Sequence, residues 1–379
     1  MRSICYFVNT DWYFDLHWLE RARYAQCHGY QVHVISDFNN EEILRKLESL
    51  GFICHQLDVK PQSINPFIFF WVFIRSCFTL HRIKPDIIHA ATIKACIYSG
   101  LYAFLMKKKL VLSIVGLGRI FTDQSSTLSV IRKIVLPFYQ ILLKNKNSYI
   151  IFEHQDDKRN FIKATGVDEE RTIVIDGAGV DTQLFNFQSE VHRQPPVVLF
   201  AARLLKQKGL LDLIAAKKIL RQRNSDFEIY VAGIPVEDID AIPHKDIIAW
   251  DKQGLITWLG KRSDMKSVIA QANIVALPST YAEGVPRILI ESAAIGRALI
   301  AYDSGGCCSI IENERNGFLV EKGNIASLAE KLEILLLNAE RRSVMATYGR
   351  DLVLTKFDSK FVLTRTLQIY ELLYNSETI

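Results

Sequence analysis

Residues 278–291 read PSTYAEGVPRILIE, a loop that leads into an apolar helix. Proline is favoured at the first position of a helix, because its fixed φ suits the helix and its missing N–H would be unpaired there anyway. A helix is therefore expected to begin near Pro286, after a loop that carries Glu283 and Gly284. The first turn of a helix has unpaired N–H groups and a partial positive charge, so it can bind an anion such as a phosphate.

Two carboxylates, Glu283 and Glu291, lie on either side of that helix start. Carboxylates accept hydrogen bonds, which suits the vicinal hydroxyls of a sugar rather than a phosphate. A glutamate pair on a solvated helix face is the simpler interpretation. However, Glu291 lies within the apolar segment ILIESAAIG, where a carboxylate without a partner would be costly and a ligand hydroxyl could be that partner. The stretch therefore predicts a site for a sugar nucleotide.

The composition is that of an ordinary globular protein, with 379 residues of which 49% are hydrophobic and 23% charged. Two domains are expected, because this length exceeds what one hydrophobic core usually organises. The net charge of +5 is too small to indicate a nucleic-acid-binding protein. The seven cysteines form no CxxC pair, and the N-terminus has no signal-peptide pattern, so a reducing cytoplasm is expected.

Strand-like and helix-like segments alternate along the chain. In the first half, strands are expected at 2–8, 31–37, 52–57, 86–90, 109–114 and 148–152, with helices at 16–29, 41–51, 66–83, 92–106 and 127–146. This alternation predicts parallel, doubly wound α/β sheets. The polar segment 186–196 suits a linker, and beyond it the pattern repeats up to a last amphipathic helix at 359–374.

The expected architecture is two Rossmann-like α/β domains that face a central cleft. The first domain is expected at 1–190, the second at 191–355, and a C-terminal helix at 356–379 is expected to pack back on the first domain. Ligands of open parallel sheets bind at the carboxyl ends of the strands, so the loops that follow strands should form the site.

The loop ARLLKQKGL at 202–210 follows such a strand and carries Arg203 and Lys208. Two cations there can neutralise a diphosphate, both when it binds and when charge develops on it as a leaving group. A solvated basic loop is the alternative, since loops at strand–helix junctions are often basic. The nearby carboxylate stretch favours the diphosphate.

These motifs occur together with VAG at 231–233, LGKRSDM at 259–265, the stretch 277–303 and NGFLV at 316–320. In this combination the second half resembles the retaining glycosyltransferases of family 4, which have the GT-B fold. In the first half, IVGLGRIFT at 114–122, FEHQDD at 152–157 and GAGVDTQLF at 177–185 further resemble the bacterial branch that builds O-antigen and related glycans on undecaprenyl diphosphate.

The resemblance implies a role for each matching residue. It gives Arg203 and Lys208 the donor diphosphate and Glu283 the hydroxyls of the transferred sugar, which makes these three the expected catalytic residues. It gives Glu291 the ribose. The other donor-binding residues that it implies are Gly284, Val285 and Arg287 at the phosphate and sugar, and Gly233, Ser263 and Asp264 at the nucleobase.

Two departures from the family concern the acceptor. After the first strand the chain has Asn9-Thr10-Asp11-Trp12 where many relatives have a glycine-rich loop, and it has Val115-Gly116 where many have a histidine. His89 ends a strand and is a further candidate, although a lone histidine there is more often structural. The expected acceptor residues are Asp11, His89, Gly116, Gly118 and Arg119.

The resemblance also implies a reaction without an enzyme nucleophile, in which the leaving phosphate accepts the proton of the acceptor. No DxD-like metal site stands out in the chain, and Arg203, Lys208 and the helix N-terminus could replace a divalent ion, so no metal or cofactor is expected. The expected partners are a UDP-sugar, with N-acetylgalactosamine (GalNAc) as the first guess, and a polyprenyl-diphosphate-linked acceptor. A sugar-nucleotide 2-epimerase of the same fold and a non-catalytic scaffold of polysaccharide assembly are the alternatives.

Three windows, 66–82, 102–109 and 131–146, place basic residues beside apolar ones. They predict contact with an anionic membrane surface, at the inner face of the bacterial cell membrane, although the apolar stripes could also face the core. The apolar run 66–80 is interrupted by Arg75 and is shorter than the ~20 residues of a membrane span, so it is not expected to cross a bilayer.

Overall fold

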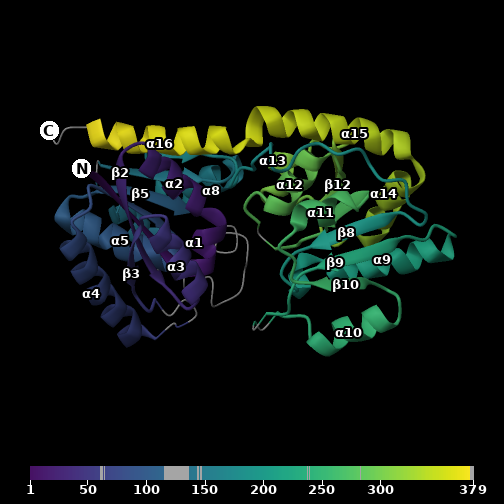
Figure 1. The fold of residues 1–379 in the computed structure, drawn as a ribbon, viewed down its shortest axis with the longest axis horizontal. Coiled ribbons are helices and arrows are strands. Elements are labelled where there is room, and N and C mark those ends of the chain that lie inside the picture. Colours follow the sequence, from purple (N-terminus) through teal and green to yellow (C-terminus); the bar gives the residue numbers. More distant parts are fainter. Residues whose placement is uncertain are drawn as a thin grey trace. The chain divides into compact units, whose positions relative to one another are not determined.

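The computed structural model describes residues 1–59, 63, 65–114, 136–142, 145, 147–236, 238, 240–281 and 283–375. The chain divides into two compact units. The first unit consists of Met1–Ile175 and Val362–Ile379, and the second of Asp176–Phe361. Each unit is a parallel sheet with helices on both faces (Figure 1).

In the described part of the first unit, seven parallel strands form one sheet in the order β3-β2-β1-β4-β5-β6-β7. The strands are β1 (Arg2–Thr10), β2 (Tyr30–Asp37), β3 (Ile53–Gln56), β4 (Ile87–Ala91), β5 (Lys109–Ile114), β6 (Ser148–Phe152) and β7 (Thr172–Val174). The helices are α1 (Asp11–His17), α2 (Leu19–Cys27), α3 (Glu41–Ser49), α4 (Pro66–Ile83), α5 (Ile93–Met106), α8 (Gln155–Thr165) and, from Val362 onward, α16 (Ser359–Asn375).

The first sheet is buried on both faces, as a parallel sheet must be. Along β1, Cys5 and Phe7 join a core that includes residues of α4 and α5. Tyr6 and Val8 join a second core that includes residues of α1, α2 and α16. Successive side chains of a strand point to opposite faces, so one apolar run serves both cores.

In the second unit, six described strands form a parallel sheet in the order β10-β9-β8-β11-β12-β13. The strands are β8 (Val197–Ala201), β9 (Glu228–Ala232), β10 (Thr257–Gly260), β11 (Ile274–Leu277), β12 (Ala298–Tyr302) and β13 (Gly317–Val320). The helices are α9 (Leu210–Gln222), α10 (His244–Lys252), α11 (Met265–Ala270), α12 (Arg287–Ile295), α13 (Cys307–Ile310), α14 (Ile325–Leu337) and α15 (Ala339–Leu352).

Two Rossmann-like α/β units were predicted, and this fold class is confirmed. Some elements differ from the expectation. The helix expected at 16–29 is the pair α1 and α2, which begins at Asp11. The motif NGFLV contains the strand β13, which pairs in parallel with β12. Of the helix expected at 127–146, residues 136–142 are helical where described.

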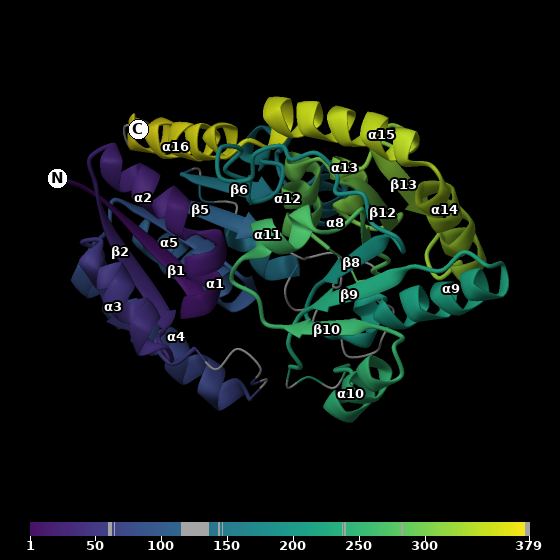
Figure 2. The same cartoon turned by 45° about the vertical axis from the view of Figure 1, so that its right-hand side comes forward.

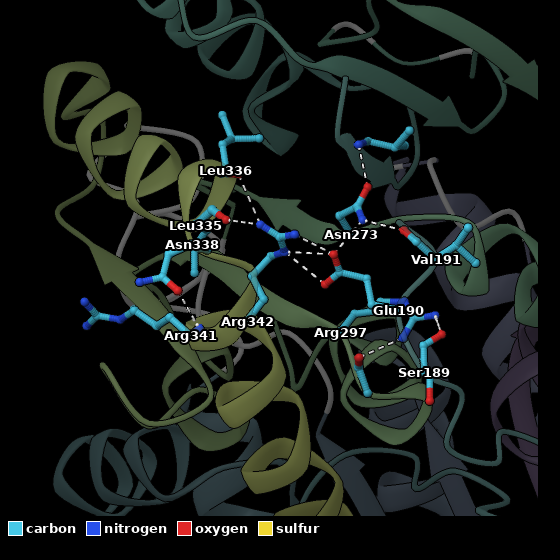
Figure 3. A network of polar contacts seen from close by, with 12 residues as sticks. Ser189, Glu190, Val191, Asn273, Arg297, Leu335, Leu336, Asn338, Arg341 and Arg342 are labelled. Atoms are coloured by element: carbon cyan, nitrogen blue, oxygen red, sulfur yellow. Dashed lines mark hydrogen bonds and ion pairs between the residues drawn. The ribbon is translucent and has the colours of Figure 1, made fainter. Parts of the chain in front are cut away.

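The boundary between the units lies at Ile175/Asp176, earlier than the boundary after residue 190 that the linker composition suggested. The polar segment before β8 is bound to the second unit by a network of polar contacts (Figure 3). Glu190 accepts hydrogen bonds from Arg342 Nε at 2.9 Å and from Asn273 Nδ2 at 2.7 Å. Arg297 Nη1 donates to the carbonyl of Gln188 at 2.7 Å. This segment is therefore part of the second unit.

Candidate active site

The helix α12 begins where its sequence predicts. Pro286 is the N-cap, with a φ of −66°, and Arg287 is the first helical residue. No side chain among the described residues caps this end of the helix. The positive end of the helix dipole therefore lies at Pro286 and Arg287, and anions bind at helix ends of this kind.

A pair of glycines fixes the loop before α12. Gly305 and Gly306 follow β12, and the N–H of Gly306 donates to the carbonyl of Glu283 at 3.1 Å. A Cβ at Gly305 would lie 2.4 Å from the oxygen of Glu283, and a Cβ at Gly306 would lie 2.3 Å from the oxygen of Gly284. Any side chain at either position would thus displace the loop.

Lys208 and Glu283 form a buried ion pair at the carboxyl edge of the second sheet. Nζ of Lys208 lies 2.5 Å from Oε1 of Glu283, and the two side chains are 10% and 11% exposed. The hydroxyl of Ser279 donates to the same carboxylate oxygen at 2.8 Å. The two predicted residues therefore meet in three dimensions.

Tyr281 is a member of this cluster that the sequence did not suggest. Its ring centroid lies 4.7 Å from Nζ of Lys208 and 6.0 Å from the guanidinium carbon of Arg203. An aromatic face attracts cations, so the ring holds both beside the same edge of the sheet. Arg203 is exposed, whereas Lys208 is buried. A single tyrosine in a loop gives no distinct sequence signal, which is why it was missed.

The loops after β8 and β11 are locked together. These strands are neighbours, and the carbonyl of Gln207 accepts the N–H of Thr280 at 2.9 Å. Gly209 has a φ of +89°, and a Cβ there would lie 1.9 Å from the carbonyl oxygen of Pro278. The chain crosses from one side of the sheet to the other at this strand pair, the position at which α/β sheets bind ligands.

Glu291 has a partner within the protein, whereas the sequence suggested a ligand hydroxyl as its partner. Nε of Arg287, one helical turn earlier, lies 2.7 Å from its Oε1, and the Glu291 side chain is 9% exposed. Burial raises the pKa of Glu291, and the charge and hydrogen bond of Arg287 oppose this shift. Arg287, predicted for its backbone N–H alone, thus also places its side chain beside this carboxylate.

The predicted nucleobase residues follow β9 and β10, the next strands along the same sheet edge. Gly233 donates its N–H to the carbonyl of Gly260 at 2.9 Å, and a Cβ at Gly233 would lie 2.2 Å from the carbonyl oxygen of Ala202. Ser263 and Asp264 are exposed, and Asp264 binds Arg262 through two hydrogen bonds of 2.8 and 2.6 Å. The hydrogen bond from Arg262 lowers the pKa of Asp264.

Two predicted acceptor residues of the first unit, Asp11 and His89, already have hydrogen-bond partners within the protein. The buried carboxylate of Asp11 accepts the N–H groups of Trp12, Asn39 and Asn40 at 2.7, 2.9 and 2.7 Å, so it holds a loop. His89 is 1% exposed, with Nδ1 2.5 Å from the hydroxyl of Tyr370 and Nε2 2.8 Å from that of Ser113. Burial lowers its pKa well below the usual value. The other predicted acceptor residues, Gly116, Gly118 and Arg119, lie outside the described residues.

The first unit has other polar atoms at the carboxyl edge of its sheet. Oδ1 of Asn9, Oγ of Ser36 and Oγ1 of Thr92 are buried and have no hydrogen-bond partner among the described residues. They lie at the ends of β1, β2 and β4, which are adjacent strands. Thr92 also has a φ of +80°, which is strained for a residue other than glycine. Buried atoms of this kind are usually paired, so they mark this edge as a candidate binding site.

Comparisons with known families identify the chain. A family model described as "Glycosyl transferases group 1" matches residues 181–352, and one described as "Glycosyl transferase 4-like" matches residues 3–154. The chain belongs to the group 1, family 4 glycosyltransferases. The predicted family and enzyme class are thereby confirmed, and the family is a retaining one.

Individual relatives align with almost the whole length of this glycosyltransferase. It is 26% identical over 344 residues, 87% of this chain and 89% of the relative, to the N,N'-diacetylbacillosaminyl-diphospho-undecaprenol alpha-1,3-N-acetylgalactosaminyltransferase of Campylobacter jejuni. Among solved structures it is similar to a glycosyltransferase from Rickettsia africae, with a TM-score of 0.78, 21% identity and 99% of both chains covered. Anabaena HepE in complex with UDP and glucose gives a TM-score of 0.77 at 22% identity, with 98% and 99% covered. The two structural likenesses show the shared GT-B fold.

Positive charge at the site of this glycosyltransferase comes from side chains and from a helix end. In the described part of the chain, no three His, Cys, Asp or Glu residues are grouped so that they could hold a metal ion. Arg203, Lys208 and the α12 N-terminus surround the end of β11 instead. Positive groups that are already in position can stabilise a leaving anion, because they need not rearrange as negative charge develops on it.

Proposed function

We propose that this glycosyltransferase moves a hexose or N-acetylhexosamine, with GalNAc as the first candidate, from a UDP-sugar to a sugar on a polyprenyl diphosphate. The product would belong to a cell-surface polysaccharide such as O-antigen. The buried pair of Lys208 and Glu283 beside the α12 N-terminus is the observation that carries the proposal. It combines a diphosphate-binding cation with a sugar-binding carboxylate.

The names of relatives support this choice of substrates. The Campylobacter relative is named for transfer of N-acetylgalactosamine to a diphospho-undecaprenol acceptor. An Escherichia coli relative, 26% identical over 268 residues, is named a UDP-Gal:alpha-D-GlcNAc-diphosphoundecaprenol alpha-1,3-galactosyltransferase. Their donor sugars differ, so the class of donor is better supported than GalNAc itself.

In the proposed donor complex, the diphosphate lies against Arg203, Lys208 and the first-turn N–H groups of α12. The phosphate competes with Glu283 for the Lys208 ammonium, which leaves the Glu283 carboxylate able to accept hydrogen bonds from hydroxyls of the sugar. Glu291 holds the ribose hydroxyls, and Gly233 lets the base approach the backbone. This scheme gives the two glutamates different ligands.

Transfer then proceeds with retention and without an enzyme nucleophile. The bond between the sugar C1 and the β-phosphate oxygen breaks as the acceptor hydroxyl forms its bond to C1 on the same face. The hydroxyl proton goes to the leaving phosphate oxygen. The enzyme contributes the positions of the reactants and the stabilisation of the UDP that departs.

We place the acceptor saccharide at the carboxyl edge of the first sheet, where Asn9, Ser36 and Thr92 have unpaired side-chain oxygens. Sugar hydroxyls would supply the missing hydrogen bonds. The reaction is proposed to need no metal, so activity should persist in EDTA. Complete loss in EDTA that magnesium restores would refute this part. We also propose that the enzyme works on the cytoplasmic face of the cell membrane.

The decisive experiment offers the protein a panel of UDP-sugars together with a synthetic prenyl-diphosphate sugar, with products identified by mass spectrometry. One donor should yield a saccharide longer by one residue, with the anomeric configuration of the donor retained. Each donor is also incubated alone. Quantitative formation of its 2-epimer would replace the transferase proposal with an epimerase, and no conversion in any mixture would favour a scaffold.

A further inference from the structure

Large aromatic side chains form an exposed stripe along α4. The most exposed of them are Phe67 at 85%, Phe70 at 62%, Trp71 at 62% and Phe78 at 69%. Ile74, at 43%, lies between them. Steps of three and four residues place all five on one face of the helix, over a length of roughly 17 Å. We call these five residues the aromatic stripe.

The opposite face of α4 belongs to the core of the first unit. Val72, Ser76 and Leu80 are 3%, 0% and 0% exposed. Phe69 packs on Tyr98 of α5 with ring centroids 4.7 Å apart. By length and composition α4 could cross a membrane. Its contacts with α5 instead hold it along the outside of the first unit (Figure 1, Figure 2).

The end of α5 extends the apolar surface. Phe104, Leu105 and Met106 are 38%, 68% and 45% exposed, and α5 packs beside α4. Soluble proteins expose single apolar residues freely, but so many large exposed apolar residues on two packed helices mark an interaction surface.

The charged residues within α4 and α5 are all basic. The sequences of α4 and α5 contain no Asp or Glu. Exposed basic residues occur on α4 and just beyond the two helices: Arg75, His81, Arg82, Lys84 and Lys107. Apolar aromatic groups flanked by cations match the interface of an anionic bilayer, with acyl chains below and negative headgroups above.

We propose that the aromatic stripe and the end of α5 insert into the interfacial region of an anionic lipid bilayer, with α4 lying in the plane of the membrane. The aromatic rings reach the boundary between headgroups and acyl chains, while Arg75, Arg82 and Lys84 bind lipid phosphates. The core-facing side of α4 keeps the helix from crossing the bilayer.

The biological purpose of this surface rests on the proposed function. A polyprenyl-linked acceptor is confined to the membrane, so an enzyme that uses it must work at the membrane surface. The carbonyl of Ser63, just before α4, accepts a hydrogen bond of 2.7 Å from Nζ of Lys94 in the first turn of α5. The start of the stripe therefore lies near the end of β4, where Thr92 lies. Insertion there would bring the lipid surface close to the acceptor edge of the first sheet.

The test is flotation of the full chain with vesicles of phosphatidylcholine and phosphatidylglycerol in a 3:1 ratio, and with phosphatidylcholine alone. The triple variant Phe67→Ser/Phe70→Ser/Trp71→Ser should lose at least about tenfold in partition coefficient, because three large apolar side chains no longer leave water for the bilayer. The matched control is Leu337→Ser/Val344→Ser, two residues of the second unit that are 74% and 64% exposed. It should bind as the natural chain does. Equal binding of triple variant and natural chain would overturn the proposal.

Two further measurements exclude other occupants. A carbonate wash should release the natural chain from vesicles, whereas resistance to it would mean that α4 spans the bilayer. Sedimentation without lipid should give the same mass for the natural chain and the triple variant. A natural dimer that the variant dissociates would make the stripe a self-association surface.

Activity assays separate this proposal from the proposed function. The triple variant should keep its rate with a short-chain, water-soluble acceptor and lose rate with a vesicle-embedded one. If neither protein transfers sugar, the proposed function fails, while flotation still decides the membrane proposal.

Discussion

Two side chains of opposite charge, Lys208 and Glu283, share a buried position at the end of β11. The motifs around them identified both residues from sequence, because their chemistry is carried by residue type and order. The contact between Lys208 and Glu283 and the packing of the Tyr281 ring beside Lys208 could not be predicted from the sequence. Asp11 and His89 show the converse: their chemistry suits a ligand, but backbone N–H groups and buried hydroxyls already use it.

Replacing Lys208 with alanine should lower kcat/KM by about 10²–10³-fold, the usual loss when one stabilising group is removed from a developing anion. Lys206→Ala is the matched control, since Lys206 lies on the same turn, Lys206–Lys208, and is exposed. Steady-state transfer rates check both. If the Lys208 variant transferred sugar at the rate of the natural chain, the proposal that Lys208 binds the diphosphate would be wrong.

Glu291 gives a prediction about pH. Because burial raises its pKa above the ordinary value of a glutamate, the folded chain holds this proton more tightly than the unfolded chain does. The stability linked to Glu291 is thus present below the unfolded pKa and lost as the pH rises through the folded pKa. Glutamine does not titrate, so the free energy of unfolding of Glu291→Gln should rise relative to that of the natural chain as the pH increases from the ordinary pKa of a glutamate.

Urea unfolding at several pH values measures this difference. A difference that stays constant with pH would show that the carboxyl has an unshifted pKa. The same variant should bind UDP-sugar more weakly, because an amide accepts fewer hydrogen bonds from ribose than a carboxylate does.

At the scale of elements, the strands of both sheets were predictable because β-branched and apolar runs alternate with helical periods. The short elements were not. α13 has four residues, and β13 resembles a hairpin arm by composition and becomes a parallel strand only because β12 presents an open edge. The end of the first domain was also misplaced, since composition marks 186–196 as polar but cannot show that Arg342 and Asn273 bind Glu190.

A substitution at Gly209 tests the contact between the loops that follow β8 and β11. Gly209→Ala combines an unfavourable positive φ with a Cβ placed 1.9 Å from the carbonyl oxygen of Pro278. Stability should fall by roughly 3 kcal/mol and kcat should fall with it, because Lys208 is the preceding residue. Gly254→Ala is the control, since φ there is +65° with no atom within 4 Å, and it should cost only ~1–2 kcal/mol. If both variants lost the same stability, the contact with Pro278 could not be the cause of the loss in Gly209→Ala.

At the scale of the whole molecule, each unit draws on distant parts of the chain. The first unit takes its last helix from beyond the second, and Tyr370 of that helix lies 2.9 Å from the hydroxyl of Tyr6. The second unit fixes the segment before β8 through α15. A mutation should therefore act within the unit to which its contacts belong.

Arg342→Met should destabilise the second unit by about 3 kcal/mol, because Glu190 and the carbonyls of Leu335 and Leu336 lose their buried donor. Hydrogen exchange followed peptide by peptide should show faster exchange from Asp176 to Phe361 and little change before it. Arg341→Met, at the adjacent and less buried position, should cost under ~1 kcal/mol. Equally fast exchange in both units would mean that they unfold together.

The position of α16 has a consequence for synthesis on the ribosome. Val362, Leu367, Ile369, Tyr370 and Leu373 complete a core whose other members come from the first strands and helices of the chain. Those early elements emerge first, yet they cannot close this core until everything from Asp176 to Phe361 has been translated. At roughly 5–20 residues per second, the delay is on the order of ten seconds or more. The unit that is made first therefore completes its core last, and the apolar surface that α16 covers stays exposed in the meantime.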